Sequence, residues 1–224
     1  MKPQTGHRFA LSLLATGIIS ISTATLAAQV PAGTILAEQQ TLVRNNGSEP
    51  ASLDPHKVES NVEFDIISDL FDGLIAIRKD GSVEPRLAEK WDNQDNTVWT
   101  FHLRPGITWS DGTAITAQDV VWSWQRLVDP ATGSPYATYP GNMHIVNAAD
   151  IAQGKKAPDT LGVKALNDTT LQVTLNQPTA SFLPMLAHPS LVPVDRYLLA
   201  AMPRSGLSRS TSLAAGRTKS LTGW

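Results

Sequence analysis

Histidine, serine and carboxylate side chains are the groups in this sequence that could bind a metal ion or carry out catalysis. The 224-residue chain contains five histidines and no cysteine. A zinc site requires ligands at close, paired spacing, often on one helix, and the histidines do not show it: they are His7, His56, His102, His144 and His188. The spacing therefore predicts no metal site, and nothing in the sequence predicts a cofactor.

A secreted hydrolase would require an activated serine or a pair of catalytic carboxylates. The turn sequence Ser110-Asp111-Gly112 lacks the flanking glycines of a nucleophile elbow. Asp54, Asp65, Asp69 and Asp72 form an apparent acidic cluster, but the last three are spaced for one face of a helix, where solvent exposure explains them. There is no glycine-rich phosphate loop, so we expect a protein that is not an enzyme.

Tryptophans are the other side chains that could bind a ligand, and four of them lie between Trp99 and Pro130. Exposed indoles stack on ring-shaped ligands, which would make the chain an exported cell-wall or carbohydrate-binding module. The alternative is a hydrophobic core. The periodicity favours the core for Trp99, Trp109 and Trp124, while the binding module stays open as the second hypothesis.

The elements that must position these residues follow from hydrophobic periodicity and turn residues. Hairpins or strands are predicted over 73–85, 90–106 and 162–178, with a further strand over 39–46. Helices are predicted over 61–74, from Thr116 to Pro130, and within 179–189. Thr116 and Asp119 resemble a capping box, and the helix that they open has an apolar stripe: Val120, Val121, Trp124, Leu127 and Val128. Strands and helices mix without βαβ regularity, which predicts an α+β fold or a segregated α/β fold.

The N-terminus has the features of a secretory signal peptide. Lys2 and Arg8 precede an apolar run over 9–21 that is too short to span a bilayer, and small residues follow. Residues 1–27 are expected to be removed by cleavage near Ala27. A chain without thiols tolerates an oxidising compartment, so we expect export to a bacterial periplasm.

Charge is distributed unevenly along the chain. The formal net charge is −2, while residues 1–27 carry two basic residues, residues 198–224 carry four, and neither segment has an acid. The region between them therefore carries a formal charge of −8. Such an acidic body argues against nucleic acid as a partner.

Long motifs from the N-terminus to about Asp195 resemble a known family. They are LVRNNGSEPASLDPHK, DLFDGL, WTFHLRPGITWSDGTAITAQDVVWSWQRLVDP and SPYATY. These stretches are similar to those of the periplasmic oligopeptide-binding proteins, which belong to family 5 of the solute-binding components of ABC importers and include murein-peptide-binding relatives.

The resemblance implies a fold of the periplasmic-binding-protein type II kind, in which two lobes close over a peptide. Residues 28–71 would begin lobe I, residues 72–195 would form a small accessory domain, and residues 196–224 would be a divergent basic tail. The second lobe of the family has no counterpart in the sequence. We therefore expect a C-terminally truncated form, a partial fragment with negligible peptide affinity.

The resemblance also implies where a peptide would bind. In the family the ligand backbone pairs with protein strands, while its side chains enter roomy pockets. The matching positions are Glu59, Ser60 and Asn61, just after LDPHK, and Tyr136 in SPYATY. Ser68 stands where relatives have an arginine, which removes any contact that the arginine would make. The implied partners are an oligopeptide and an inner-membrane ABC permease, and the implied state is a monomer.

Overall fold

The computed structural model describes residues 33–34 and 43–201. Residues 43–201 fall within one compact unit. The expected signal peptide lies outside the described residues, as does most of the basic tail. Within the described part of the chain, no helix is long and apolar enough to cross a membrane.

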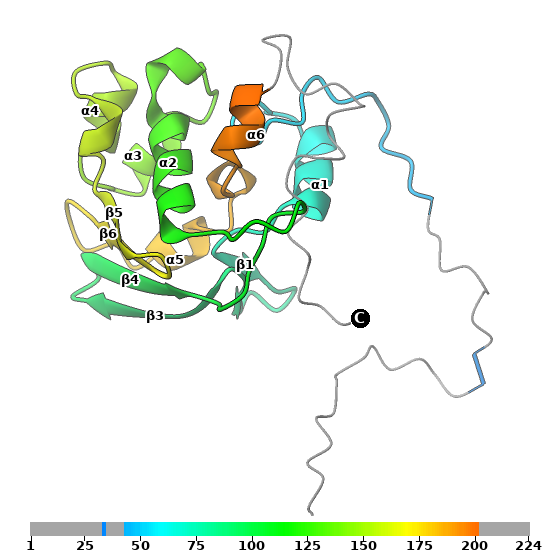
Figure 1. Cartoon of the computed structure of the whole chain (residues 1–224), viewed down its shortest axis with the longest axis horizontal. Helices are drawn as coiled ribbons and strands as arrows, with labels where there is room; N and C mark the ends of the chain where they lie inside the picture. Colours follow the sequence, from blue (N-terminus) through cyan, green and yellow to red (C-terminus); the bar gives the residue numbers. More distant parts are fainter. Residues whose placement is uncertain (1–32, 35–42, 202–224) are drawn as a thin grey trace, which may run out of the picture. The chain divides into compact units, whose positions relative to one another are not determined.

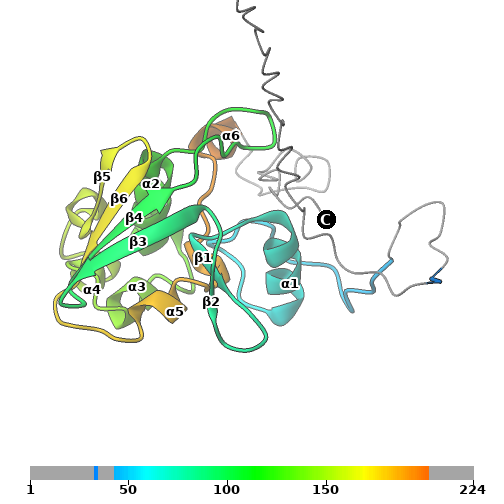
Figure 2. The same cartoon turned by 90° about the horizontal axis from the view of Figure 1, so that it is seen from below.

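A four-stranded antiparallel sheet lies along one side of the described unit, with helices over one of its faces (Figures 1 and 2). Its strands are β3 (Ala88–Gln94), β4 (Val98–Leu103), β5 (Val163–Asn167) and β6 (Thr170–Thr174), in the order β3-β4-β6-β5. Alternate residues of β4 and β6 are buried, so one face of the sheet packs on the core and the other faces solvent. Helix α2 lies across the buried face (Figure 1).

The predicted hairpins are present, and their turns have the expected chemistry. Asp95 and Asn96 join β3 to β4 with φ of 49° and 54°, the left-handed conformation that a tight hairpin turn requires. A separate two-stranded sheet pairs β1 (Ile75–Ile77) with β2 (Val83–Pro85) around Gly81, whose φ is 82°. Turn residues therefore located these hairpins correctly.

The helices lie over the buried face of the sheet and to one side of it (Figures 1 and 2). They are α1 (Asn61–Leu70), α2 (Ala117–Val128), α3 (Tyr139–Asn142), α4 (Ala148–Ala152), α5 (Phe182–Met185) and α6 (Arg196–Ala201). The described residues also contain three short 3₁₀ turns: η1 (Pro130–Thr132), η2 (Pro158–Thr160) and η3 (Pro189–Leu191).

Helix α2 confirms the sequence prediction at both ends. The Thr116 hydroxyl accepts a bond from the Asp119 amide at 3.3 Å, and the Asp119 carboxylate accepts one from the Thr116 amide at 2.8 Å. The helix ends at Val128, two residues before Pro130. All five residues of its predicted apolar stripe are buried. Local capping and burial of one face thus agree on the same helix.

The tryptophans contribute to the hydrophobic core and do not form an exposed platform for a ligand. Trp99, Trp109 and Trp124 are 5%, 4% and 0% exposed, and Trp91 and Trp122 are half-buried. These are the five tryptophans of the described residues, so their burial does not favour a carbohydrate platform.

Two expected boundaries are wrong. The helix predicted over 61–74 ends at Leu70, because Phe71 is extended and buries its side chain with Val58, Ile67 and Val192. This small cluster is separate from the main core. The strand predicted over 39–46 lies partly outside the described residues, and its described part, 43–46, is not a strand. A strand needs ladder hydrogen bonds from a neighbour, and no described strand pairs with this segment.

Candidate functional site

The predicted contact residues form one exposed run that leads into helix α1. Glu59, Ser60 and Asn61 are exposed, whereas Val58 immediately before them is fully buried. Ser60 is extended, with φ −106° and ψ 155°, and serves as the N-cap of α1. The backbone is therefore strand-like at Ser60, immediately before α1 begins.

A buried carboxylate holds this run in place. Glu63 is 5% exposed, and its Oε2 accepts hydrogen bonds from the amides of Glu59 and Ser60, both at 3.1 Å, and from the Ser60 hydroxyl at 3.0 Å. Its Oε1 accepts a fourth from the amide of Ala51 at 2.9 Å. Burial opposes ionisation of Glu63, but these hydrogen bonds outweigh it and keep the pKa below its usual value.

The hydrogen bonds to Glu63 restrict how a peptide could pair with the run. The amides of Glu59 and Ser60 are already used, and the Ser60 carbonyl accepts from the amides of Glu63 and Phe64. What remains for an extended ligand is the Glu59 carbonyl, the Asn61 amide at the first position of the helix, and the side chains. The run can therefore support only a short ladder of backbone bonds.

Tyr136 lies in an aromatic cluster beside α1. Its ring centroid is 5.6 Å from that of Phe64 and 4.7 Å from that of His188. Phe64 lies one turn after Asn61 on α1, and Tyr139 completes the cluster at 4.4 Å from His188. The structure thus connects the two predicted contact regions through Phe64, a residue that sequence reasoning missed.

His188 is a neutral imidazole that accepts a hydrogen bond through Nδ1. Its Nδ1 accepts a bond from the Ser190 amide at 3.2 Å, so the proton of the neutral ring is on Nε2. Burial lowers its pKa. The only sequence signal was a His-Pro pair in a loop, which does not reveal an aromatic neighbourhood.

Asp54, His56 and Arg126 form a second buried polar network, here called the Asp54–His56–Arg126 network. Arg126 donates from Nη1 and Nη2 to the two carboxylate oxygens of Asp54, at 3.0 and 2.6 Å. Its Nη1 also lies 2.7 Å from Nδ1 of His56. Asp54 is 6% exposed and His56 is fully buried. Sequence reasoning treated Asp54 and His56 separately and missed Arg126.

The charges of this network are settled by burial and by Arg126. Burial and the adjacent guanidinium lower the pKa of His56 to about 3, despite the nearby Asp54 carboxylate. Burial opposes ionisation of Asp54, but its hydrogen bonds and ion pair with Arg126 keep its pKa below the usual value. The network at neutral pH is therefore an ion pair with a neutral imidazole as second acceptor.

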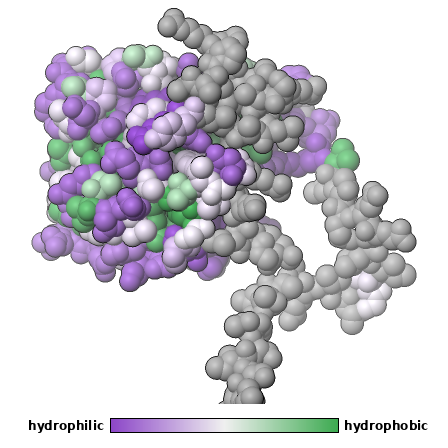
Figure 3. All heavy atoms as spheres, in the orientation of Figure 1, coloured by the Kyte–Doolittle hydropathy of each residue, from purple (hydrophilic) through white to green (hydrophobic). Residues whose placement is uncertain are grey.

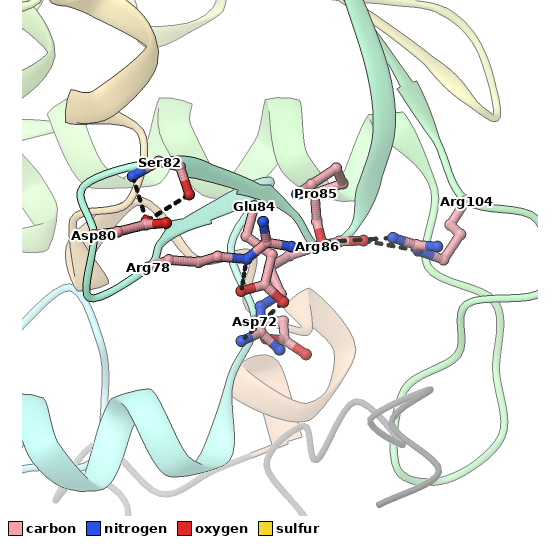
Figure 4. A network of polar contacts seen from close by, with 8 residues as sticks. All are labelled: Asp72, Arg78, Asp80, Ser82, Glu84, Pro85, Arg86 and Arg104. Carbon is pink, nitrogen blue, oxygen red and sulfur yellow. Dashed lines mark hydrogen bonds and ion pairs between the residues drawn. The ribbon is translucent and has the colours of Figure 1, made fainter. Parts of the chain in front are cut away.

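A groove of about 360 Å³ lies beside the C-terminal end of α1 and the β1–β2 hairpin, with Ser68 among its lining residues. Figure 4 shows the ion pairs on the hairpin side: Arg86 lies 3.8 Å from Asp72 and 3.7 Å from Glu84. Arg104 donates to the carbonyl of Arg86 at 3.0 Å. These contacts tie the hairpin to the chain that follows α1.

The acidic residues of the apparent cluster near α1 have ordinary structural surroundings. Asp65 and Asp69 are exposed as expected, and Asp69 pairs with Arg44 at 2.6 Å. The expectation is wrong for Asp72, which follows the end of α1 and is half-buried. Across the described residues, no three histidine or acidic side chains are grouped to hold a metal ion.

The face of the molecule in Figure 3 is mainly hydrophilic, with small hydrophobic patches. Large exposed apolar side chains are scattered, as at Ile77 and Leu166.

Comparison with known proteins gives consistent matches. Residues 82–217 match the family described as bacterial extracellular solute-binding proteins, family 5 Middle, a range that includes part of the basic tail. The periplasmic oligopeptide-binding protein OppA of Escherichia coli is 55% identical over 83% of the chain and 35% of its own length. The probable deoxycholate-binding periplasmic protein YgiS of the same organism is 50% identical over 78% of the chain and 33% of its length.

A solved structure shows the same fold. That of the Escherichia coli murein tripeptide-binding protein MppA superposes with a TM-score of 0.74 at 44% identity, covering 76% of this chain and 33% of MppA. The mixed α/β arrangement thus matches part of the fold of this family. The chain spans about a third of the length of these relatives.

Proposed function

The chain belongs to the bacterial extracellular solute-binding proteins of family 5, and we propose on that basis that it binds oligopeptides as the periplasmic solute-binding component of an ABC importer. Murein peptides are the narrower possibility. Glu59, Ser60, Asn61 and Tyr136 are the proposed contact residues, and they form one wall of the peptide site.

The observation that carries the proposal is the exposed run Glu59–Asn61, which is extended at Ser60 and enters helix α1 at Asn61. Two of its amides are fixed by a buried carboxylate, so its shape is set before any ligand arrives. A preorganised backbone reduces the ordering cost of binding. Backbone groups are common to all peptides, so such contacts suit broad specificity.

The aromatic cluster beside the run supports a role for Tyr136. A half-buried tyrosine provides a large contact area at low entropic cost, and Phe64 and His188 pack against its ring. A ligand side chain extending from the run along α1 would meet this cluster. A bile acid is the competing ligand, since a relative at 50% identity is a probable deoxycholate-binding protein.

The test is nuclear magnetic resonance of the isotope-labelled chain during titration with tripeptides, pentapeptides, deoxycholate and a saccharide. Peptides at millimolar concentration should shift the amide signals of Glu59 to Asn61 and the ring signals of Tyr136. Substitution of Tyr136 by alanine should weaken the peptide shifts, whereas the same change at exposed Tyr197 should not. Shifts with deoxycholate alone would overturn the peptide assignment.

Calorimetry at micromolar concentration provides a second arm. In this family the peptide is enclosed between two lobes, and we expect the chain, after removal of its signal peptide, to bind too weakly for detectable heat. Micromolar affinity for tri- to pentapeptides would contradict that expectation.

The remaining parts of the proposal concern location and organisation. We infer export to the periplasm with cleavage near Ala27, a monomeric state, and delivery of peptide to an inner-membrane permease. We further propose that 28–71 begins lobe I, that 72–195 is an accessory domain and that 196–224 is a divergent tail. N-terminal sequencing of the exported product tests the cleavage site.

A further inference from the structure

We propose that Arg126 is a positioning residue for the contact run Glu59–Asn61, acting through Asp54 and His56. This inference rests on the proposed function for its meaning, but its evidence is geometric. It assigns helix α2 a role in ligand recognition although no residue of α2 is among the proposed contacts.

The first step is that the chain before α1 has no regular structure to hold it. Residues 51–60 contain neither helix nor strand, and irregular segments move unless they are tied to the fold. Asp54 organises the turn locally: its carboxylate accepts from the His56 amide at 3.1 Å, and its carbonyl accepts from the Lys57 amide at 2.9 Å.

The second step is that Arg126 ties this turn to the core from 72 residues away in sequence. Two parallel hydrogen bonds to one carboxylate define direction as well as distance, and the third contact, to His56, fixes the other side of the turn. A lysine could not reproduce this arrangement, since its ammonium is a point charge without the planar fork.

The third step is that α2 itself is anchored to the segment after α5. The Trp124 indole donates to the Leu191 carbonyl at 2.9 Å, and the Ser123 hydroxyl accepts from the Val194 amide at 2.9 Å. Val192 lies between these anchors and packs with Val58, which directly precedes the contact run. Residues 123–126 of α2 therefore hold both the turn that precedes α1 and the segment 191–194 that packs beside it.

The Asp54–His56–Arg126 network is linked to the contact run Glu59–Asn61 by a short stretch of chain. Only residues 57 and 58 separate His56 from Glu59, and Val58 is fully buried. A displacement of the His56 backbone is therefore transmitted along the chain to the amides of Glu59 and Ser60, which donate to Glu63. The positioning path runs from α2 through the turn to the exposed backbone of the contact run.

Amide hydrogen exchange of the full chain without ligand tests the proposal. In Arg126→Lys the amides of Glu59 and Ser60 should exchange faster by about tenfold or more relative to strand amides such as that of Phe101. These two amides bond to Glu63, not to Asp54, so they report whether the effect reaches the run. Arg104→Lys is the matched control, since Arg104 is a part-buried arginine that bonds to the Arg86 and Pro85 carbonyls (Figure 4).

The two possible results separate clearly. Faster exchange at Glu59 and Ser60 in Arg126→Lys, with no change there in Arg104→Lys, supports the positioning role. Equal acceleration at all protected amides, or acceleration confined to His56 and Lys57, overturns it. Should Arg126→Lys not fold, Asp54→Asn weakens the same ion pair and is read in the same way. Because no peptide is present, failure of this test is distinct from failure of peptide binding.

Discussion

Replacement of His56 by glutamine should change how the stability of the protein depends on pH. The pKa of His56 is about 3 in the folded protein and 6.5 ordinarily. Between these values the unfolded chain binds a proton that the native protein does not. The stabilisation associated with neutral His56 is therefore fully present above pH 6.5 and is lost as the pH falls toward 3.

The magnitude follows from the size of the shift. Each pKa unit corresponds to about 1.4 kcal/mol, so the free energy of unfolding should fall by roughly 2 kcal/mol between pH 6 and pH 4 through this group alone. In His56→Gln the side-chain oxygen can still accept from Arg126, but the residue does not titrate. This contribution to the pH dependence should then disappear.

The assay is urea unfolding of wild type and His56→Gln at pH 7, 6, 5 and 4, followed by circular dichroism. All other ionisable groups are common to both proteins, so the difference between the two curves isolates His56. The gap in unfolding free energy should change by about 3 kcal/mol between pH 7 and pH 4, in favour of the variant at low pH. Parallel curves would refute the conclusion that His56 is buried in its neutral form beside Arg126.

Three further substitutions and one spectroscopic measurement test the fold. Trp124→Phe removes a fully buried indole and its bond to the Leu191 carbonyl, and should cost about 2–3 kcal/mol by urea unfolding; a loss below about 0.5 kcal/mol would contradict its core position. Gly162→Ala would place a methyl group 2.6 Å from the Val146 side chain and should cost about 2 kcal/mol or more, and unchanged stability would mean that the backbone moves freely there. Thr116→Ala removes the cap of α2 and should cost about 1 kcal/mol, with retained stability counting against the capping role. Tryptophan emission should be blue-shifted and unaffected by saccharides, whereas a response to saccharides would revive the platform hypothesis.

Much of the fold was predictable because its determinants are local. The capping box at Thr116, the turn at Gly81 and the alternation along β4 each depend on residues close in sequence, and each appears as expected. The end of α1 was not predictable in this way. Phe71 leaves the helix because it packs on Val192, which belongs to a distant segment.

The candidate site likewise combines residues that the sequence indicated with residues that only the structure revealed. Family resemblance selected Glu59, Ser60, Asn61 and Tyr136, and these assignments stay predictions. The structure adds what surrounds them, namely the buried Glu63 carboxylate and the rings of Phe64 and His188. Glu63 was readable in principle, since a serine followed three residues later by a glutamate is the signature of a capping box.

The sequence alone determined the hairpins, helix α2, the burial of Trp99, Trp109 and Trp124 and the family resemblance, because periodicity, turns and motifs depend on neighbouring residues. It did not predict the short helices α3 and α4. Only the tertiary structure decided that Arg126 meets Asp54 and His56, and that Tyr136 approaches α1 through Phe64. These contacts join residues that are far apart in the chain, and no local pattern specifies which distant partner a buried charge or ring will find.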